Sequence, residues 1–224
     1  MDDAYLVDAD DGIFDQFDLP QRSERSEKEA SRGTATFFER NGKAMVYKHY
    51  RRGGLMSKII KDQYLWMGIK RTRSFIEFRA LDIMRELGLS VPRPVAARVN
   101  RRKGYYTADL ITEEIKDTKT LGDILKDGLF SSDIFSRIGR ALKVFHERGC
   151  YHPDLNVENI LINDEQEIFL LDFDRWKMKK TSDGSSIENI NRLNRSILKQ
   201  SALVGRPFPK EEWAQLIVAY RTSK

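Results

Sequence analysis

The chain has 224 residues and a mass of 26.1 kDa, of which 40% are hydrophobic and 33% charged, enough to bury a core in one large domain or two small lobes. No apolar run approaches the roughly 20 residues that a membrane-spanning helix needs. One cysteine excludes a disulfide framework, and the start lacks the basic and apolar regions of a secretory signal, so we expect a reducing cytoplasm.

The charge is unevenly distributed. The formal total is +5, yet residues 1–30 hold ten acidic residues against three basic ones, which leaves +12 on the remainder. We therefore predict an acidic lead-in over residues 1–31, mobile or weakly packed, before a strongly basic body. Such a body attracts nucleic acids, anionic lipids or phosphorylated substrates, and its charge alone does not choose among them. No zinc-ligand spacing or basic motif interleaved with aromatic residues is present, so no nucleic-acid partner is expected.

Residues 32–113 are predicted to form a β-rich N-lobe. The β-rich stretches 34–39 and 43–50 flank Asn41-Gly42, which is the strongest short signal for a β-hairpin. Apolar residues recur at near-helical spacing over residues 74–87, and Gly88 and Pro92 then end the helix. A turn at residues 101–104 precedes a predicted strand over residues 105–111.

Residues 51–73 form a basic segment with seven cations and one acid. Such a segment suits an anionic substrate or a membrane surface. Within it, six apolar residues fall on one helical face: Leu55, Met56, Ile59, Ile60, Tyr64 and Met67. This face fits an interfacial helix and a core helix equally well.

Residues 114–224 are predicted to form a mostly helical C-lobe. The stretch 132–148 has one apolar face and ends at Gly149. Residues 151–159 are polar and broken by Pro153, so we expect a loop there. The apolar runs 160–162 and 168–171 are separated by five polar residues and predict a tight hairpin that leads into Asp172.

This second half carries a pattern typical of phosphoryl transfer. That reaction needs a carboxylate at the attacking hydroxyl, oxygen ligands for Mg²⁺ and cations on the nucleotide phosphates. Asp154 and Asn159 have the five-residue spacing of the base and the metal-binding amide in a kinase catalytic loop. Asp172 ends a strand, and Asp174 offers a second oxygen ligand. Singly, such residues are more often turn formers, but their ordered occurrence predicts an ATP- and Mg²⁺-dependent catalytic site.

The N-lobe carries candidates for nucleotide binding. Lys48 lies near the end of the second hairpin strand, where a kinase has its phosphate-binding lysine, although a solvated lysine would also fit. Glu77 is its candidate partner on the following helix, yet Ser74 and Glu77 also form a capping box that needs no nucleotide. Gly33 would let backbone amides approach a phosphate, or it is simply a turn.

Three features argue against a protein kinase. Pro153 occupies the position of the arginine that grips a phosphorylated activation loop, and Asn156 replaces a phosphate-contacting lysine. No Ala-Pro-Glu segment follows Asp174, and only about 50 residues remain, too few for a peptide-docking subdomain. We therefore expect a small or lipid-linked acceptor.

The sequence resembles the 3-deoxy-D-manno-octulosonic acid (Kdo) kinases, a lipopolysaccharide kinase group with a protein-kinase-like fold. The resemblance rests on seven ordered segments: residues 49–55, 72–78, 91–98, 108–112, 154–161, 172–175 and 191–196. It implies an α+β, two-lobed fold and ATP-dependent phosphorylation of a Kdo hydroxyl on Kdo-lipid A. It also implies a peripheral position at the cytoplasmic face of the bacterial inner membrane.

The matching segments also suggest the roles of individual residues. Catalysis is expected from Asp154, Asn159 and Asp172, metal binding from Asn159, Asp172 and Asp174, and nucleotide binding from Gly33, Lys48, Glu77 and Leu161. Arginines bind carboxylates and phosphates bidentately, so Arg51, Arg52, Arg192 and Arg195 are candidate acceptor-binding residues.

Two other functions fit the same residues less well. The first is another kinase, such as one acting on a heptose of the lipopolysaccharide core or on a small molecule. The second is a binding module that keeps the kinase shape without catalysis. The presence of Asp154, Asn159 and Asp172 together argues against that second reading.

Overall fold

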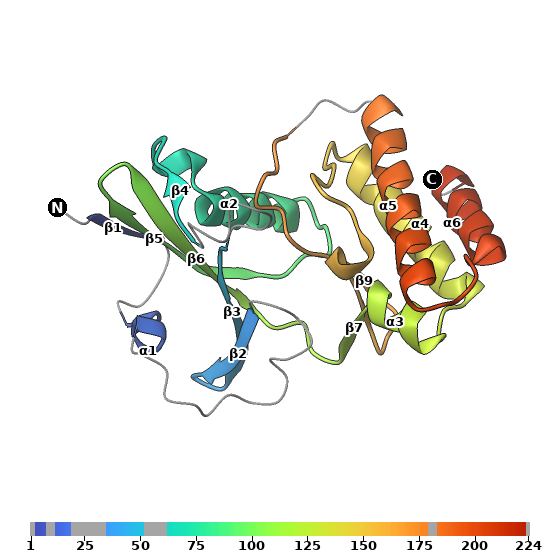
Figure 1. Ribbon diagram of the computed structural model, residues 1–224, viewed down its shortest axis with the longest axis horizontal. Helices are drawn as coiled ribbons and strands as arrows, with labels where there is room; N and C mark the ends of the chain where they lie inside the picture. The colour runs from blue at the N-terminus through green and yellow to red at the C-terminus, as the bar shows by residue number, and fades with distance from the viewer. Residues whose placement is uncertain (1–2, 8–11, 19–34, 52–61, 179–182, 223–224) are drawn as a thin grey trace. The chain divides into compact units, whose positions relative to one another are not determined.

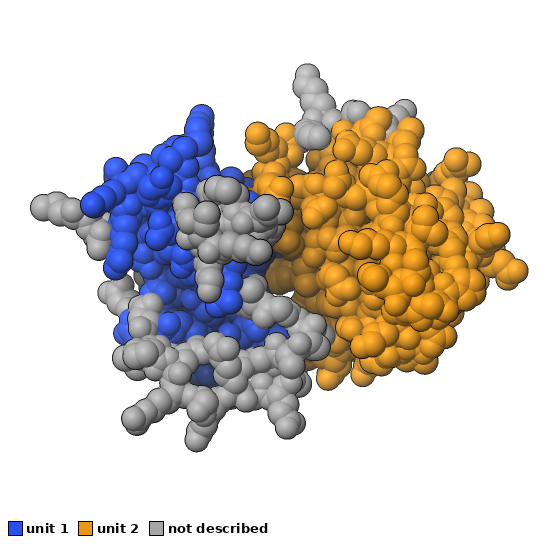
Figure 2. Space-filling view, viewed as in Figure 1, with its two compact units in different colours: residues 1–82, 93–114 blue, residues 83–92, 115–224 orange. Residues whose placement is uncertain are grey.

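The computed structural model describes residues 3–7, 12–18, 35–51, 62–178 and 183–222 (Figure 1). The chain divides into two compact units, which are coloured separately in Figure 2. Unit 1 comprises residues 1–82 and 93–114, and unit 2 comprises residues 83–92 and 115–224. Among the described residues, no helix is long and apolar enough to cross a membrane.

Unit 1 is built on an antiparallel sheet. Its strands are β1 (Asp3–Val7), β2 (Ala35–Arg40), β3 (Lys43–His49), β4 (Tyr64–Leu65), β5 (Pro94–Arg102) and β6 (Tyr105–Glu113). They lie in the order β1-β5-β6-β3-β2, and β4 pairs with the start of β6. The predicted hairpin is confirmed as β2 and β3, which turn through Asn41 and Gly42 with φ angles of 53° and 72°. β5 is a strand that the sequence did not predict.

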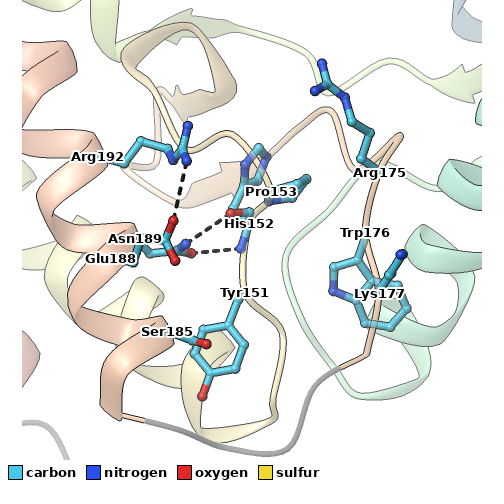
Figure 3. A pocket seen from close by; sticks show the side chains of 10 residues that line it. All are labelled: Tyr151, His152, Pro153, Arg175, Trp176, Lys177, Ser185, Glu188, Asn189 and Arg192. Carbon is cyan, nitrogen blue, oxygen red and sulfur yellow. Dashed lines mark hydrogen bonds and ion pairs between the residues drawn. The ribbon is translucent and has the colours of Figure 1, made fainter.

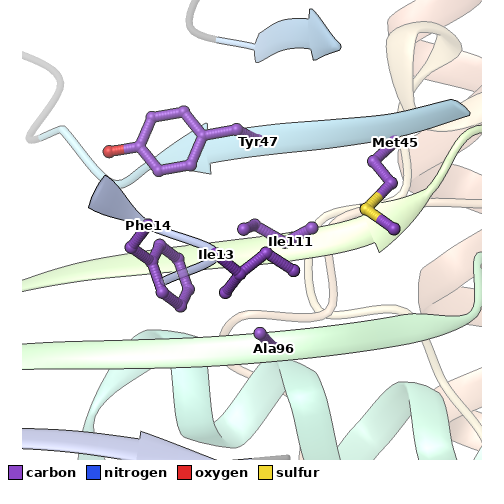
Figure 4. Close-up of a cluster of buried hydrophobic side chains, with 6 residues drawn as sticks. All are labelled: Ile13, Phe14, Met45, Tyr47, Ala96 and Ile111. Atoms are coloured by element: carbon purple, nitrogen blue, oxygen red, sulfur yellow. The ribbon is translucent and has the colours of Figure 1, made fainter. Parts of the chain in front are cut away.

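The core of unit 1 lies against the central strands (Figure 4). Met45 and Tyr47 of β3 meet Ala96 of β5 and Ile111 of β6. Side chains on one face of a strand recur at every second residue, so Met45 and Tyr47 lie on the same side of the sheet. The helix α2 (Arg73–Glu86) buries its own apolar residues, among them Phe75, Phe78 and Leu81.

The sequence predicts that the acidic first segment is a mobile or weakly packed lead-in. Part of this segment is instead packed in unit 1. β1 pairs with β5, and Ile13 and Phe14 are buried in the unit 1 core beside the short helix α1 (Asp15–Asp18). The ring of Phe17 stacks on Tyr47 at 3.8 Å between centroids. Three apolar side chains thus anchor an otherwise acidic stretch, because their burial outweighs the polar composition around them.

The prediction of a helical face over residues 55–67 is wrong for the part of this range that the structure describes. Tyr64 and Leu65 form β4 and pair with Tyr106 and Tyr105, so this part of the chain is extended. Gly68, three residues after the strand, adopts a φ of 93°, a conformation that favours glycine, at the start of the short 3-10 helix Ile69–Arg71. Residues 52–61 lie outside the described part of the chain, so the remainder of the predicted face stays a prediction.

Unit 2 combines helices with a small three-stranded sheet. The helices are α3 (Leu121–Asp127), α4 (Ser132–Glu147), α5 (Asp183–Leu203) and α6 (Lys210–Thr222), and the strands are β7 (Thr118–Thr120), β8 (Ile160–Asn163) and β9 (Ile168–Leu170). The strands pair antiparallel in the order β7-β8-β9. The sequence predicts α4 and the β8–β9 hairpin correctly, but not α5 and α6.

Two contacts of α4 organise the middle of unit 2. The helix packs closely along α6, where Gly139 faces the backbone of Leu216. At its other end, Phe145 stacks on Phe173, with ring centroids 6.3 Å apart and planes at 3°. α4 therefore supports the segment that follows β9, which carries Asp172 and Asp174.

Candidate active site

The loop after α4 is held by the imidazole of His152. Its Nδ1 accepts a hydrogen bond from the backbone N–H of Asp154 at 3.0 Å, so the ring proton is on Nε2. Nε2 donates to the carbonyl of Leu171 at 2.6 Å, and the ring lies against Phe173, 4.6 Å between centroids. A neutral His152 thus connects the residue before Asp172 to the loop that carries Asp154.

The hairpin brings Asn159 to the same place. Ile160 of β8 is opposite Leu170 of β9, and one position further the N–H of Leu171 donates to the carbonyl of Asn159 at 3.0 Å. The side-chain amide of Asn159 donates to the carbonyl of Asp154 at 3.1 Å. Backbone pairing and two side-chain bonds therefore gather Asp154, Asn159 and Asp172, as the sequence predicts for these three positions.

Asp172 has an unusual backbone conformation. Its φ is 65°, in the left-handed region, where aspartate and asparagine are tolerated better than most residues. Such conformations are strained and persist only where the surroundings enforce them, here the His152 bond to Leu171 and the buried Phe173. The Asp172 side chain is half-buried.

Arg192 of α5 contacts the candidate base directly. Its Nη1 lies 3.1 Å from Oδ1 of Asp154, and its Nη2 lies 3.6 Å from Glu188, one turn earlier. The sequence predicts Arg192 as an acceptor-binding residue but not this ion pair. The side chain of Asp154 is exposed.

α5 also holds the loop through two residues that sequence reasoning did not identify. Oδ1 of Asn189 accepts from the N–H of His152 at 2.8 Å, and its Nδ2 donates to the His152 carbonyl at 3.0 Å (Figure 3). Ser196 Oγ accepts from the N–H of Val157 at 3.1 Å. Asn189, Arg192 and Ser196 recur at helical spacing on one side of α5, and that polar periodicity was the signal available in the sequence.

In unit 1, Lys48 and Glu77 form the predicted ion pair. Lys48 Nζ lies 2.8 Å from Glu77 Oε2, and Glu77 is almost fully buried. The Tyr50 hydroxyl donates to the same carboxylate oxygen, and the Lys48 ammonium lies 4.7 Å from the Tyr50 ring centroid. Ser74 donates to the carbonyl of Arg98, so the ion pair, rather than a capping box, describes the contacts of Glu77.

A polar network lies beside this pair on β3 and β6. Burial raises the pKa of Asp109, but hydrogen bonding from His49 and the charge of Arg98 outweigh it and hold that pKa below its usual value. His49 Nδ1 lies 2.6 Å from Asp109, and this hydrogen bond raises the pKa of His49. Tyr47 donates to the same carboxylate at 2.8 Å. In the sequence, the sign of this network is Asp109, a charged residue inside an otherwise apolar strand.

Five further residues were predicted as site residues. Gly33 and Arg52 lie outside the described residues, and Arg51 and Arg195 are exposed. Leu161 is buried in β8, opposite Phe169. The roles predicted for these five positions stay predictions.

The oxygen donors near the hairpin suit a hard cation such as Mg²⁺. Mg²⁺ is usually held by one or two carboxylates together with substrate phosphates and water, and does not need a complete protein cage. Asp172 and Asn159 supply such a partial set, whereas Asp174 is buried and pairs with Arg175 at 3.7 Å. Among the described residues there is no group of three or more His, Cys, Asp or Glu side chains that could hold a metal.

A pocket of about 230 Å³ opens beside the catalytic loop (Figure 3). It lies between the loop, the segment after Asp174 and the first turns of α5. Its walls are Tyr151, His152, Pro153, Arg175, Trp176, Lys177, Ser185, Glu188, Asn189 and Arg192. Three of these side chains are cations and one is an acid.

Comparisons with known proteins agree on the family. The model of the lipopolysaccharide kinase (Kdo/WaaP) family matches residues 18–220. A 3-deoxy-D-manno-octulosonic acid kinase of Vibrio cholerae serotype O1 is 36% identical over 190 residues, which are 85% of this chain and 80% of the relative. The enzyme of the same description from Haemophilus influenzae strain PittGG is 36% identical over 98% of this chain and 97% of its own length.

A solved structure supports the fold. The structure described as WaaP in complex with acyl carrier protein matches 98% of this chain and 90% of its own, with a TM-score of 0.60 at 14% identity. The predicted α+β, protein-kinase-like fold is thereby confirmed. Together with the family match over residues 18–220 and the two relatives, these comparisons show that the chain belongs to the lipopolysaccharide kinase (Kdo/WaaP) family.

Proposed function

We propose that the protein is an ATP-dependent Kdo kinase, which phosphorylates a hydroxyl of Kdo on Kdo-lipid A in lipopolysaccharide inner-core biosynthesis. The acceptor comes from the relatives, because Kdo kinases of Vibrio and Haemophilus align over most of this chain at 36% identity. The reaction type rests on one observation, the gathering of Asp154 and Asn159 beside Asp172 by the β8–β9 hairpin and His152.

In this proposal each residue has a limited task. Asp154 accepts the proton of the acceptor hydroxyl, because its carboxylate is exposed and its backbone is fixed by two hydrogen bonds. Asn159 and Asp172 would hold Mg²⁺, and Asp174 is proposed as a further oxygen ligand. Bound Mg²⁺-ATP supplies the phosphoryl group and the charge that neutralises the phosphate oxygens.

Lys48 is proposed to bind the nucleotide phosphates. Glu77 directs its ammonium, and Tyr50 holds Glu77 through the shared carboxylate oxygen. A buried carboxylate with two donors keeps one orientation, so the lysine is positioned before the nucleotide arrives. Gly33 and Leu161 remain proposed nucleotide contacts on the strength of the family resemblance alone.

The acceptor is tested by a panel of substrates. We expect phosphate transfer from Mg²⁺-ATP to Kdo-lipid A, and none to lipid A without Kdo or to a generic protein. Mass spectrometry and NMR of the product would locate the phosphate on Kdo. Transfer only to a heptosylated core, with the phosphate on heptose, would instead establish the related heptose kinase activity.

We also propose a peripheral position at the cytoplasmic face of the inner membrane. Support comes from the basic body, and from Leu65 and Met67, which are both 60% exposed close to Lys70, Arg71 and Arg101. Exposed apolar residues beside cations suit an anionic lipid surface. We expect the protein to sediment with phosphatidylglycerol vesicles at low salt, and less in variant Leu65→Ser/Met67→Ser. Equal sedimentation with neutral phosphatidylcholine vesicles would contradict this proposal.

A further inference from the structure

The pocket beside the catalytic loop contains a buried hydrogen-bond donor that has no acceptor among the residues that the structure describes. Trp176 lines the pocket and is 8% exposed, and within the described residues its Nε1–H has no acceptor. In Figure 3 this nitrogen is on the edge of the indole that faces Tyr151 across the pocket. Leaving a buried donor unsatisfied costs free energy, which a ligand that accepts this bond would recover.

The charges of the pocket select an anionic ligand. Arg192 and Lys177 contribute cations from opposite walls, and Arg175 adds a third at the rim. Glu188 is the single acid in the lining, and it shares Arg192 with Asp154. A ligand with one carboxylate and several hydroxyls fits this set, because the carboxylate meets the cations and the hydroxyls donate to Glu188.

The size and position of the pocket indicate a single sugar rather than a nucleotide. Its volume of about 230 Å³ is below the roughly 300–1,000 Å³ of pockets that hold drug-sized ligands. Tyr151 provides an aromatic wall. Pro153 lines the pocket and the candidate base follows as the next residue, so a sugar bound here has its hydroxyls near Asp154.

We propose that this pocket binds the acid sugar of the acceptor, with Arg192, Lys177 and the Nε1–H of Trp176 directed at its carboxylate. The proposal rests on the proposed function for the identity of the sugar. It adds Trp176, Lys177 and Glu188, none of which the sequence motifs identify, as determinants of acceptor specificity. When the sugar binds, Arg192 leaves the carboxylate of Asp154 and pairs with the carboxylate of the sugar.

A binding experiment tests the pocket without turnover. Calorimetry would measure the affinity of the wild-type protein for the methyl glycoside of Kdo and for the carboxamide of the same glycoside, which lacks the charge. We expect the acid to bind more tightly. Trp176→Phe keeps an aromatic ring but removes the pyrrole ring with its N–H donor. It should weaken binding of the acid about tenfold and weaken binding of the carboxamide less, because a hydrogen bond to a charged acceptor is stronger than one to a neutral acceptor. Lys177→Gln should act in the same direction.

Matched controls exclude general effects of substitution. Trp213→Phe on α6 and Lys199→Gln on α5 lie outside the pocket and should bind both ligands as the wild type does. The affinity for ATP should be unchanged in all four variants, and each should show a cooperative thermal unfolding transition. In turnover assays, Trp176→Phe should raise the KM for Kdo-lipid A and leave the KM for ATP unchanged.

The outcomes separate this proposal from the proposed function. Equal affinity for acid and carboxamide, or normal binding of the acid by both Trp176→Phe and Lys177→Gln, would overturn the pocket assignment even if the wild type phosphorylates Kdo-lipid A. Conversely, a protein that transfers no phosphate to Kdo-lipid A, yet prefers the acid in a Trp176-dependent way, would overturn the proposed function and support the pocket.

Discussion

His146 is buried in unit 2, and its imidazole is neutral at pH 7. It is 3% exposed, its Nδ1 lies 2.8 Å from the hydroxyl of Tyr220, and its Nε2 lies 3.3 Å from Oδ1 of Asn189. Burial, together with the nearby charge of Lys143, lowers the pKa of His146 to about 4. Oδ1 of Asn189 also accepts the backbone N–H of His152, so one amide side chain contacts both histidines.

This burial predicts a pH-dependent stability. In the unfolded chain His146 binds a proton below its ordinary pKa of 6.5, whereas in the folded protein it does so only near 4. The free energy of unfolding should therefore fall as the pH falls from 6.5 to 4, by at most roughly 3 kcal/mol from this residue. Urea unfolding at a series of pH values would measure it. The variant His146→Gln should lose less stability over this range, and parallel curves would contradict the assignment.

At the residue scale, the sequence was informative where chemistry fixes the spacing. Asp154, Asn159 and Asp172 could be predicted because a loop and a hairpin of defined length connect them. The ion pair of Arg192 with Asp154 could not, since it joins positions 38 residues apart through the packing of α5. The unpaired donor of Trp176 is likewise a property of its surroundings and not of its residue type.

At the scale of elements, the contact between α4 and α6 depends on one glycine. A Cβ atom at Gly139 would clash with the carbonyl of Leu216 and lie 3.1 Å from the backbone nitrogen of Tyr220. The obstacle is backbone rather than a flexible side chain, so the helices would have to separate. Gly139 therefore sets the distance between two helices whose sequences show no special motif.

Gly139→Ala should destabilise unit 2. Overpacking typically costs about 1–3 kcal/mol, which here outweighs the helix propensity that alanine adds. Differential scanning calorimetry would show a lower melting temperature. The matched control is Gly104→Ala, because Gly104 has no atom within 4 Å of the added Cβ and should melt as the wild type does. Unchanged stability of Gly139→Ala would contradict the close approach.

The first segment makes a second prediction at this scale. Phe14 is 3% exposed in the core of unit 1, and the guanidinium of Arg98 lies 4.6 Å from its ring centroid. Phe14→Ala should cost about 3–5 kcal/mol in the free energy of unfolding, the usual range for a buried phenylalanine. Leu203→Ala, at a position 71% exposed, serves as control. A loss below about 0.5 kcal/mol, as at surface sites, would show that the segment is dispensable.

Elements were predictable where their local signals were strong. The β2–β3 hairpin has Asn41-Gly42 at its turn, and α4 has a clear apolar face that ends at Gly149. The packing of residues 13–17 was missed, because a few apolar side chains in an acidic stretch give no periodic signal. Tyr64 was assigned to a helical face, because its pairing with Tyr106 of β6 is a non-local contact that the sequence does not show.

At the scale of the whole molecule, each of the two compact units holds its own group of proposed site residues. Unit 1 holds the Lys48–Glu77 pair, and unit 2 holds the hairpin with Asp154, Asn159 and Asp172. Each part is supported by residues of its own unit, Tyr50 in the first and His152 with Asn189 in the second. The family and the fold could be predicted from ordered motifs, whereas the pocket beside the catalytic loop could be found only in the structure.

The most direct test of the central claim is single-turnover transfer of the γ-phosphate to Kdo-lipid A by Asp154→Asn. Asparagine keeps the shape of the side chain and cannot accept the proton, so transfer should be at least about a hundredfold slower. ATP affinity and melting temperature should match the wild type, as should transfer by the control Asp164→Asn in the β8–β9 turn. Transfer by Asp154→Asn at a rate near that of the wild type would contradict the assignment of Asp154 as the base of a Kdo kinase.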